Sequence, residues 1–331
     1  MYNGKRIDAH THCFFDDDWE RIFAFFDERN IDMLNCICGS VKYSEYRVPV
    51  FKEMYTLYPD KYSWGTYIPL PDFKVSDAEY ANNVIEHLKI QFEKGAASCK
   101  AYNDIGMSVK KQDGSFILID DPLFIPIFEY IASVDKVLCM HMAEPWPRWS
   151  SWPDSNPELT GKKIYGTLAD NPMWEKMDFP DFWEQMKAQE NIIKRHPNLK
   201  FMGAHFAGLD YDVAKVAELL DKYPNLCVDT SGRRRSLAVQ DTNKVRDFII
   251  KYQDRILWGM DQQNFKVMSK MSDDEKDDFY KMMNDGYKFE FDYYESNEIV
   301  QVDEFKTQGL NLPNEVLEKI YYRNAKKWLK I

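Results

Sequence analysis

Eight short apolar segments, spread along the whole chain and separated by helical patterns, constrain the fold most. They lie at residues 6–12, 32–39, 62–70, 96–102, 137–142, 199–205, 226–231 and 255–261. Nearly continuous apolar character is typical of parallel strands that are buried on both faces. The intervening segments, such as DAEYANNVIEHLKIQFEKG, have helical periodicity. Eight such units predict an α/β protein with a (β/α)₈ TIM-barrel fold.

Two insertions interrupt this alternation. Residues 144–182 follow the fifth predicted strand and are rich in Trp and Pro, which favours a folded lid over about 145–182 rather than disorder. Residues 263–300 follow the eighth strand and contain the helix-like stretch SDDEKDDFYKMMND. The sequence has no Gly/Ser linker, low-complexity stretch or internal repeat, so we expect a single domain over residues 1–331.

Composition narrows the classes of partner. The net charge of −11 disfavours nucleic acid and anionic membranes, because both bind basic surfaces. The sequence contains neither a long apolar span nor an apolar N-terminal signal segment. Its six cysteines form no CxxC pair and mostly lie in apolar runs, as reduced thiols of a cytoplasmic protein do. We therefore expect a small-molecule substrate, and a homodimer is compatible with the aromatic loops.

Chemically capable side chains gather where the predicted strands end. In a (β/α)₈ barrel the carboxyl ends of the strands meet at one mouth, which carries the active site. The residues at these ends are His10, His12, Lys100, His141, His205, Asp229 and Asp261. His87 and His196 lie away from the strand ends, and we expect plain surface or capping roles for them.

The pair His10 and His12 suggests a metal site. Residues i and i+2 of a strand point to the same side, so both imidazoles can face the barrel axis. Zinc accepts imidazole and carboxylate ligands, and His141 and Asp261 are suited to complete the set. A carboxylate such as Asp261 can also take a proton from metal-bound water. A single His-x-His pattern is weak evidence, but the chain has only six histidines and two more stand at strand ends.

For several other polar residues the sequence allows two roles, one functional and one structural. Lys100 either binds substrate or makes a structural ion pair, and Asp229 is equally suited to be a structural hydrogen-bond acceptor. Arg233 and Arg234 belong to a run of three arginines after the seventh strand. Such a run forms a solvated face or holds a substrate carboxylate bidentately. Trp146 and the other tryptophans of the insertion are expected in the core of the lid or against the substrate.

Four motifs, IDAHTH, CMHMAEP, FMGAHFAG and RILWGMDQ, resemble the amidohydrolase superfamily in their order and spacing. The C-terminal segment LNLPNEVLEKIYYRNAKKWL resembles its amidohydrolase-2 branch of metal-dependent barrel hydrolases. The resemblance covers about residues 5–330, and its motifs are specific for the superfamily but only weakly for the reaction. The stretch GMDQQ departs from the usual Ser or Thr before the aspartate. The EPWPRWSSW insertion resembles a poorly characterised bacterial subgroup, so the substrate stays open.

The resemblance implies a role for each matching residue. His10, His12, His141 and Asp261 would bind one divalent metal, zinc first, with manganese and iron also allowed. Asp261 would also be the general base. His205 would polarise the substrate or transfer a proton, or bind a second ion in a two-metal site.

The resemblance also implies roles for two further residues, and that of Lys100 depends on the number of ions. Lys100 stands where two-metal members carry a carboxylated lysine that bridges the ions, whereas the branch is mostly of the one-metal kind. Glu144 would orient a ligand or bind substrate.

The resemblance implies a hydrolase that uses metal-activated water on an amide, ester or lactone of a small, carboxylate-bearing substrate. A decarboxylase or hydratase built on the same residues is the main alternative, and a metal-free lactonase is another. A barrel that binds a ligand without turnover is a hypothesis of a different class, which the metal content of the purified protein would distinguish.

Overall fold

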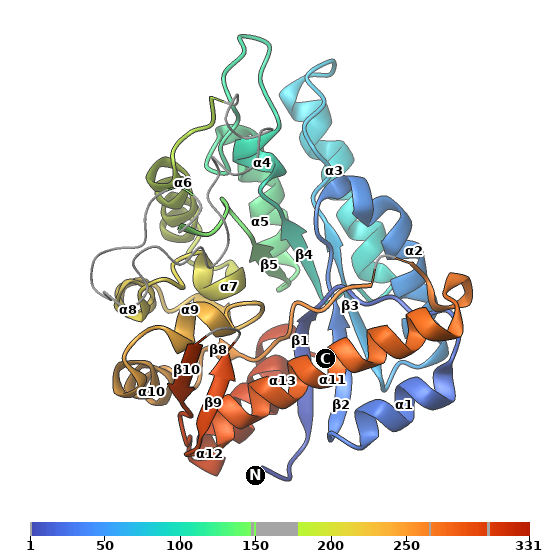
Figure 1. Ribbon diagram of the computed structural model, residues 1–331. Helices are drawn as coiled ribbons and strands as arrows, with labels where there is room; N and C mark the ends of the chain where they lie inside the picture. The colour runs from blue at the N-terminus through green and yellow to red at the C-terminus, as the bar shows by residue number, and fades with distance from the viewer. Residues whose placement is uncertain (1, 147–148, 150–177, 265, 303–304) are drawn as a thin grey trace.

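Eight parallel strands form the centre of the molecule (Figure 1). The computed structural model describes residues 2–146, 149, 178–264, 266–302 and 305–331. The strands pair in sequence order. They are β1 (Arg6–Thr11), β2 (Ile31–Cys36), β3 (Tyr62–Tyr67), β4 (Ser98–Ala101), β5 (Val137–Met140), β6 (Lys200–Gly203), β7 (Leu226–Asp229) and β8 (Ile256–Leu257). The predicted TIM barrel is confirmed, and most strands end a few residues earlier than predicted.

The barrel closes where the segment that begins with β8 meets β1. Backbone hydrogen bonds join Ala9 N to Trp258 O (2.9 Å), Asp261 N to His10 O (2.8 Å) and His12 N to Gln262 O (2.7 Å). A register shift in the pairing of β1 with β2 between Asp8 and Thr11 lies at the same place. The junction between β1 and the segment after β8 is called the seam below. His10 and His12 lie on one side of this seam, and Asp261, which follows β8, lies on the other.

Helices and short turns connect the strands and cover the barrel. Those before β6 are α1 (Trp19–Asp27), α2 (Val41–Leu57), α3 (Asp77–Glu93), α4 (Asp104–Met107), η1 (Pro122–Phe124), α5 (Ile125–Ser133) and α6 (Phe182–Arg195). Those after β6 are α7 (Ala204–Ala207), α8 (Val213–Lys222), α9 (Arg234–Ala238), α10 (Thr242–Lys251) and η4 (Met268–Lys270). The helical pattern of the segment DAEYANNVIEHLKIQFEKG is confirmed by α3. Several of these helices begin at a side-chain cap, as Ser76 shows by accepting from Glu79 N.

The insertion after β8 is larger than its helical pattern indicated. A helix of 23 residues, α11 (Asp273–Glu295), starts at a capping box of Ser272 and Glu275. An antiparallel pair, β9 (Ile299–Val302) and β10 (Phe305–Gln308), follows it. The sequence analysis did not predict this pair. Among the described residues, no helix combines the length and apolar character that a membrane crossing requires.

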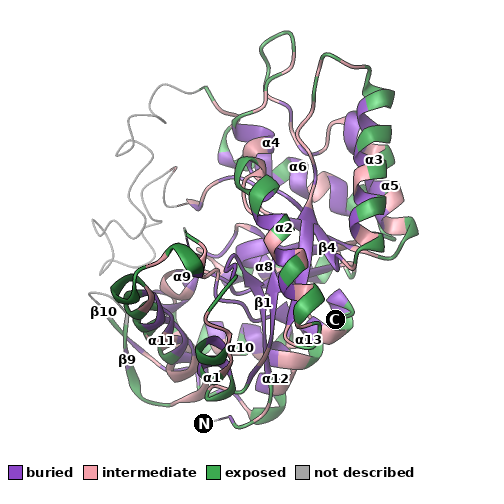
Figure 2. Ribbon diagram, turned by 90° about the vertical axis from the view of Figure 1, so that its right-hand side faces the viewer, coloured by how far each residue is buried: buried purple, intermediate pink, exposed green. Residues whose placement is uncertain are grey.

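The strands of the barrel are buried, whereas the helices expose their outer faces (Figure 2). The C-terminal segment consists of α12 (Asn314–Glu318), a π-helical turn η5 (Lys319–Arg323) and α13 (Asn324–Leu329). Trp328 and Leu329 pack in one cluster with Ile7 and Cys139 of the barrel interior. The Asn324 amide donates to the backbone oxygens of Gln253 and Ile256, at 2.6 and 2.7 Å. The last helix is thereby fixed against the barrel interior.

The predicted lid of residues 145–182 falls largely on residues 147–148 and 150–177, which lie outside the described residues. At its end, α6 begins with a capping box formed by Asp181 and Glu184. All six cysteines are free and buried, as the sequence predicted.

Candidate metal centre and active-site cavity

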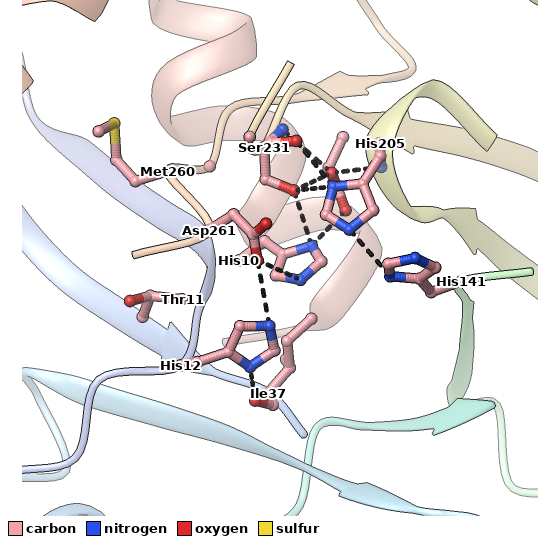
Figure 3. A network of polar contacts seen from close by, with 12 residues as sticks. His10, Thr11, His12, Ile37, His141, His205, Ser231, Met260 and Asp261 are labelled. Atoms are coloured by element: carbon pink, nitrogen blue, oxygen red, sulfur yellow. Dashed lines mark hydrogen bonds and ion pairs between the residues drawn. The ribbon is translucent and has the colours of Figure 1, made fainter. Parts of the chain in front are cut away.

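The carboxyl ends of the strands bring the sequence-selected residues into one polar network (Figure 3). His10 and His12 belong to β1 and the residue after it, His205 follows β6, and Asp261 follows β8. Thr11 points away from the two imidazoles that flank it. Its hydroxyl donates to Gln262 O at 3.0 Å, so it helps to hold the seam.

The ring of His12 has a defined tautomer. Its Nδ1 lies 2.6 Å from the carbonyl oxygen of Ile37, so Nδ1 carries the proton and donates it. In the neutral ring, Nε2 then presents a lone pair to Asp261 Oδ1, which is 3.1 Å away. Two lone pairs at this distance repel each other unless a proton or a cation lies between them. This contact between two acceptors therefore indicates a position for a cation between His12 Nε2 and Asp261 Oδ1.

The ring of His10 is oriented in the same way. Its Nδ1 lies 2.8 Å from Asp229 Oδ2, so Nδ1–H donates to this buried carboxylate. Asp229 Oδ1 accepts from His205 N (2.9 Å), Ser231 N (3.1 Å) and Ser231 Oγ (2.5 Å). His10 Nε2 therefore keeps its lone pair and lies 3.7 Å from Asp261 Oδ1. A carboxylate on the far nitrogen of a metal-binding histidine is a common device for fixing the tautomer.

His205 and His141 form the other half of the network. His205 Nδ1 lies 2.7 Å from the carbonyl oxygen of Ser231, to which it donates its proton. His205 Nε2 then accepts from His141 Nδ1 at 3.1 Å. The remaining nitrogen of His141, Nε2, keeps its lone pair. In His10, His12 and His141 alike, Nδ1 is used for positioning, and Nε2 carries the lone pair that is available to a ligand.

The donor atoms of His10, His12 and Asp261 fit a divalent cation. They lie within 4.8 Å of one another. Two ligand atoms that each stand about 2.1 Å from one ion are roughly 3–4 Å apart, which matches the two distances to Asp261. His141 lies outside this three-residue group, although it lines the same cavity. A second group, His10, His205 and Asp229, is held together by its own hydrogen bonds.

Lys100 reaches the same lone pair that a cation would use. Its Nζ lies 3.1 Å from His10 Nε2, and the residue is 2% exposed. A cation on His10 Nε2 therefore requires the Lys100 amine to leave this position. The amine also lies over the ring of Tyr102, 5.6 Å from its centroid.

Burial favours the neutral form of the imidazoles of His12, His141 and His205. Loss of hydration lowers the pKa of His12 to about 4, and it holds the pKa values of His141 and His205 well below their usual range. Burial by itself raises the pKa of Asp261, but the surrounding His205, His12 and His10 bring it well below its usual range. A set of neutral imidazoles and one ionised carboxylate is the form that binds a metal.

A cavity of about 390 Å³ opens onto these residues. His12, His141 and Asp261 line it, and the side chain of Asp261 is 29% exposed. Six other side chains of its wall were not predicted from the sequence, namely Tyr43, Tyr46, Arg47, Tyr102, Gln263 and Ser40. The first three share a face of α2 at the spacing i, i+3 and i+4, a pattern that could have drawn attention to them.

The remaining sequence candidates lie farther from the three-residue group. The Glu144 carboxylate accepts from the Asn103 amide at 3.0 Å, which orients it. Trp146 packs against Phe182 and Trp183, with ring centroids 5.0 and 5.2 Å apart. Its place in this aromatic cluster agrees with the expected core of the lid.

The two arginine candidates face other partners. Arg233 is buried, and its Nε lies 3.4 Å from Asp210 Oδ1. Arg234 lies over Phe289, 5.5 Å from the ring centroid, and lines a different groove along α11. His196 is the C-cap of α6, and His87 contacts Thr66 at 3.2 Å, so both lie outside the network.

The backbone at the mouth adopts unusual conformations. His205 and Asp261 have left-handed φ angles of 57° and 58°. Gly232 also has a positive φ, and a Cβ there would lie 2.7 Å from Asp261 Oδ2. A Cβ on Gly259 would lie 2.8 Å from His10 Cβ. These glycines allow the close approach of the seam, and strain of this kind is often found at functional sites.

Residues 82–331 match the model of the amidohydrolase family Amidohydro_2. The chain belongs to this family. Its members are enzymes, so the network just described lies at the active-site end of an amidohydrolase barrel. No curated protein matches the sequence.

Solved structures support the same fold. 2,6-Dihydroxybenzoate decarboxylase from Rhizobium is 15% identical, with a TM-score of 0.53 and coverage of 99% of both chains. Dihydroxybenzoic acid decarboxylase from Polaromonas sp. JS666, solved with bound manganese, is 14% identical with a TM-score of 0.56, covering 99% of this amidohydrolase and 97% of that chain. 4-Oxalomesaconate hydratase from Rhodopseudomonas palustris is 14% identical with a TM-score of 0.50, covering 94% and 80%. At these identities the likeness shows the fold alone.

Proposed function

We propose that this amidohydrolase is a zinc-dependent hydrolase that cleaves an amide, ester or lactone of a small substrate. One cation would be held by His10, His12, His141 and Asp261. The observation that carries the proposal is the contact between His12 Nε2 and Asp261 Oδ1, two acceptors 3.1 Å apart with no proton of their own to share. The Nε2 lone pairs of His10 and His141 support the same assignment, because the Nδ1 atom of each ring is engaged with another residue.

A bound divalent cation would polarise the substrate carbonyl and lower the pKa of water at the site. Asp261 would receive the proton of the attacking water, and its lowered pKa and partial exposure to the cavity support this role. Asp229 holds the proton on His10 Nδ1 and so keeps His10 Nε2 available. Ile37 does the same for His12 through its carbonyl oxygen.

His205 acts through His141 in this proposal. Both of its ring nitrogens are engaged, one with Ser231 O and the other with His141 Nδ1. It would orient His141, because the lone pair of His205 Nε2 accepts the proton of His141 Nδ1. The proton-transfer role expected of His205 stays a prediction.

The first experiment measures metal. The protein purified without chelator should contain about one equivalent of a divalent metal per chain, zinc or manganese, by elemental analysis. His12→Ala should lose most of it, whereas His87→Ala, which changes a histidine outside the network, should keep it. Less than about a tenth of an equivalent in the wild-type protein would contradict the proposal, because a resident cation occupies its site nearly fully.

The second experiment identifies the reaction. The holoenzyme is incubated with a panel of amides, esters, lactones and carboxylic acids, and both acid release and carbon dioxide release are measured. The proposal expects acid release from a carbonyl derivative. Carbon dioxide release or water addition to an unsaturated acid would instead make the protein a lyase, the chemistry named for the decarboxylases and the hydratase of similar fold.

We also propose that the enzyme works in the cytoplasm as a single domain, with a homodimer as the expected assembly. Six free, buried thiols support a reducing compartment. Sedimentation of the purified protein tests the assembly, and a monomer at micromolar concentration would contradict it.

A further inference from the structure

Among the described residues, Arg47 is a buried cation without a counter-charge. The residue is 4% exposed. Its Nη2 donates a long hydrogen bond of 3.5 Å to Asn264 O, and its buried Nε has no partner in the described part of the chain. In the described part of the chain, no Asp or Glu forms an ion pair with it. Burying a charge without an ionic partner is costly, so the position calls for an explanation.

Aromatic rings surround this guanidinium but do not neutralise it. Its Cζ lies 5.2 Å from the ring centroid of Phe14, 5.8 Å from that of Tyr43 and 5.9 Å from that of Tyr46. Such contacts attract a cation moderately and leave the N–H donors unused. The rings hold the guanidinium in place at the wall of the cavity.

Arg47 opens onto the same cavity as the candidate metal residues. His12, His141 and Asp261 line the cavity together with Arg47. Its volume of about 390 Å³ is within the range of small-molecule sites. One small ligand can therefore contact the metal residues and the guanidinium at the same time.

The other basic residues considered for anion binding already have partners. Arg233 lies against Asp210, Arg234 lies over Phe289 in another groove, and Lys100 contacts His10. Arg47, in contrast, has an N–H donor that no described residue uses, and it lines the cavity beside the candidate metal residues.

The geometry points to Arg47, which belongs to α2, as the residue that binds the carboxylate of the substrate. The arginines that follow β7 would then not have this role. This inference rests on the proposed function, because it assumes that the substrate reacts at the candidate metal site. The planar guanidinium matches a carboxylate and can donate two hydrogen bonds to it. The guanidinium charge, which no described residue compensates in the free enzyme, is compensated in the complex, so Arg47 selects acids over their neutral analogues.

Stability gives a test that needs no ligand. Arg47→Met replaces the cation by a neutral side chain of similar length. If Arg47 serves a ligand, this variant should unfold at the same temperature as the wild-type protein or higher, because an uncompensated charge is removed. A drop of more than about 5 °C, the size expected when a structural ion pair is broken, would overturn the inference. The control is Arg21→Met, which removes an exposed arginine that pairs with Asp277.

Binding gives the second test. Isothermal titration of the metal-loaded enzyme compares benzoate and acetate with benzamide and acetamide, which are similar in shape but uncharged. Wild-type protein and Arg21→Met should bind a carboxylate, and Arg47→Met should bind it about ten- to a hundredfold more weakly. Arg47→Lys should lie in between, because an ammonium group does not form the paired bonds. Equal affinity in wild type and Arg47→Met, or no carboxylate binding by the wild type, would overturn the inference.

The two proposals can fail separately. Metal content is measured on every variant, and Arg47→Met should retain it. A metal-free wild-type protein that still discriminates benzoate from benzamide through Arg47 would contradict the proposed function and leave the role of Arg47 standing. A metal-loaded protein that hydrolyses carboxylate-bearing substrates as well in Arg47→Met as in wild type would support the proposed function and overturn the role of Arg47.

Discussion

The hydroxyl of Tyr287 donates a hydrogen bond of 2.9 Å to Asp8 Oδ2, and so joins α11 to the strand that carries the histidine pair. Asp8 is fully buried, and its Oδ1 accepts from His10 N (3.2 Å) and Met260 N (3.0 Å). One carboxylate thus holds both sides of the seam beneath the cavity. Through Tyr287 and Asp8, the insertion after β8 therefore stabilises the strands that carry the candidate metal residues.

Tyr287→Phe should lower the free energy of unfolding by about 1–2 kcal/mol, because a buried acceptor loses its donor. The matched control is Tyr62→Phe, which removes a buried hydroxyl that has no partner. Denaturant unfolding should show little or no loss for the control. Equal losses for the two variants would mean that the Tyr287 bond has no special role.

Asp229→Asn should weaken metal binding about ten- to a hundredfold, because the amide no longer secures the proton on His10 Nδ1. Titration against a chelating dye measures the affinity. Asp212→Asn is the control, since Asp212 caps α8 at the surface and asparagine caps helices equally well. Unchanged affinity in Asp229→Asn would show that His10 is not a ligand or needs no help from Asp229.

Glu290 should make the stability depend on pH. Burial raises the pKa of this carboxyl to about 8, against the opposing effect of Arg234. The folded protein then holds a proton that the unfolded chain releases above about pH 4.3, so stability falls as the pH rises through about 4 to 8. Asp8, with a pKa raised by burial to about 7, acts in the same direction.

Glu290→Gln mimics the protonated form and should have the higher melting temperature at pH 9, with the difference nearly vanishing at about pH 4. Glu298→Gln, an exposed change of the same kind, should show no such divergence. Parallel melting curves for Glu290→Gln and wild type at both pH values would contradict the raised pKa.

Glu295→Gln should destabilise the fold by about 3–5 kcal/mol, because it leaves the charge of Arg6 buried and unpaired. The two side chains are 2.7 Å apart and only 1% and 4% exposed. Glu295 also accepts from Tyr2 N and the Tyr321 hydroxyl, at 2.8 and 3.1 Å. The double variant Arg6→Met, Glu295→Gln should recover part of the loss in urea unfolding, and strict additivity would argue against coupling.

The fold was predictable because parallel strands buried on both faces leave continuous apolar runs in the sequence. The same runs mark the mouth of the barrel, so the positions of His10, His12 and Asp261 followed from the topology. The antiparallel pair β9 and β10 left no comparable signal, because four-residue strands outside the barrel carry too few apolar positions to form a pattern.

Arg47 and Ser231 show what sequence reasoning could not provide. Arg47 reaches the cavity only because α2 is rotated to turn the face of Tyr43 and Tyr46 toward it, and helix rotation is set by packing. Ser231 Oγ contacts His10 Nδ1 at 2.9 Å and His205 Nδ1 at 3.0 Å, which no spacing in the chain indicates. Arg234, attractive by position, lies in another groove because the turn after β7 directs it to α11.

The seam between β1 and the segment after β8 has a thermodynamic consequence. His10 and His12 lie on one side of it and Asp261 on the other, so any ligand that binds all three links the barrel's first and last strands. Opening of the barrel at this seam and release of that ligand are then a single coupled equilibrium. The amide hydrogens of Ala9, His12 and Asp261, which bridge the seam, should exchange with solvent more slowly when zinc is bound. The cation would thus act as the closing link of the barrel as well as its catalyst.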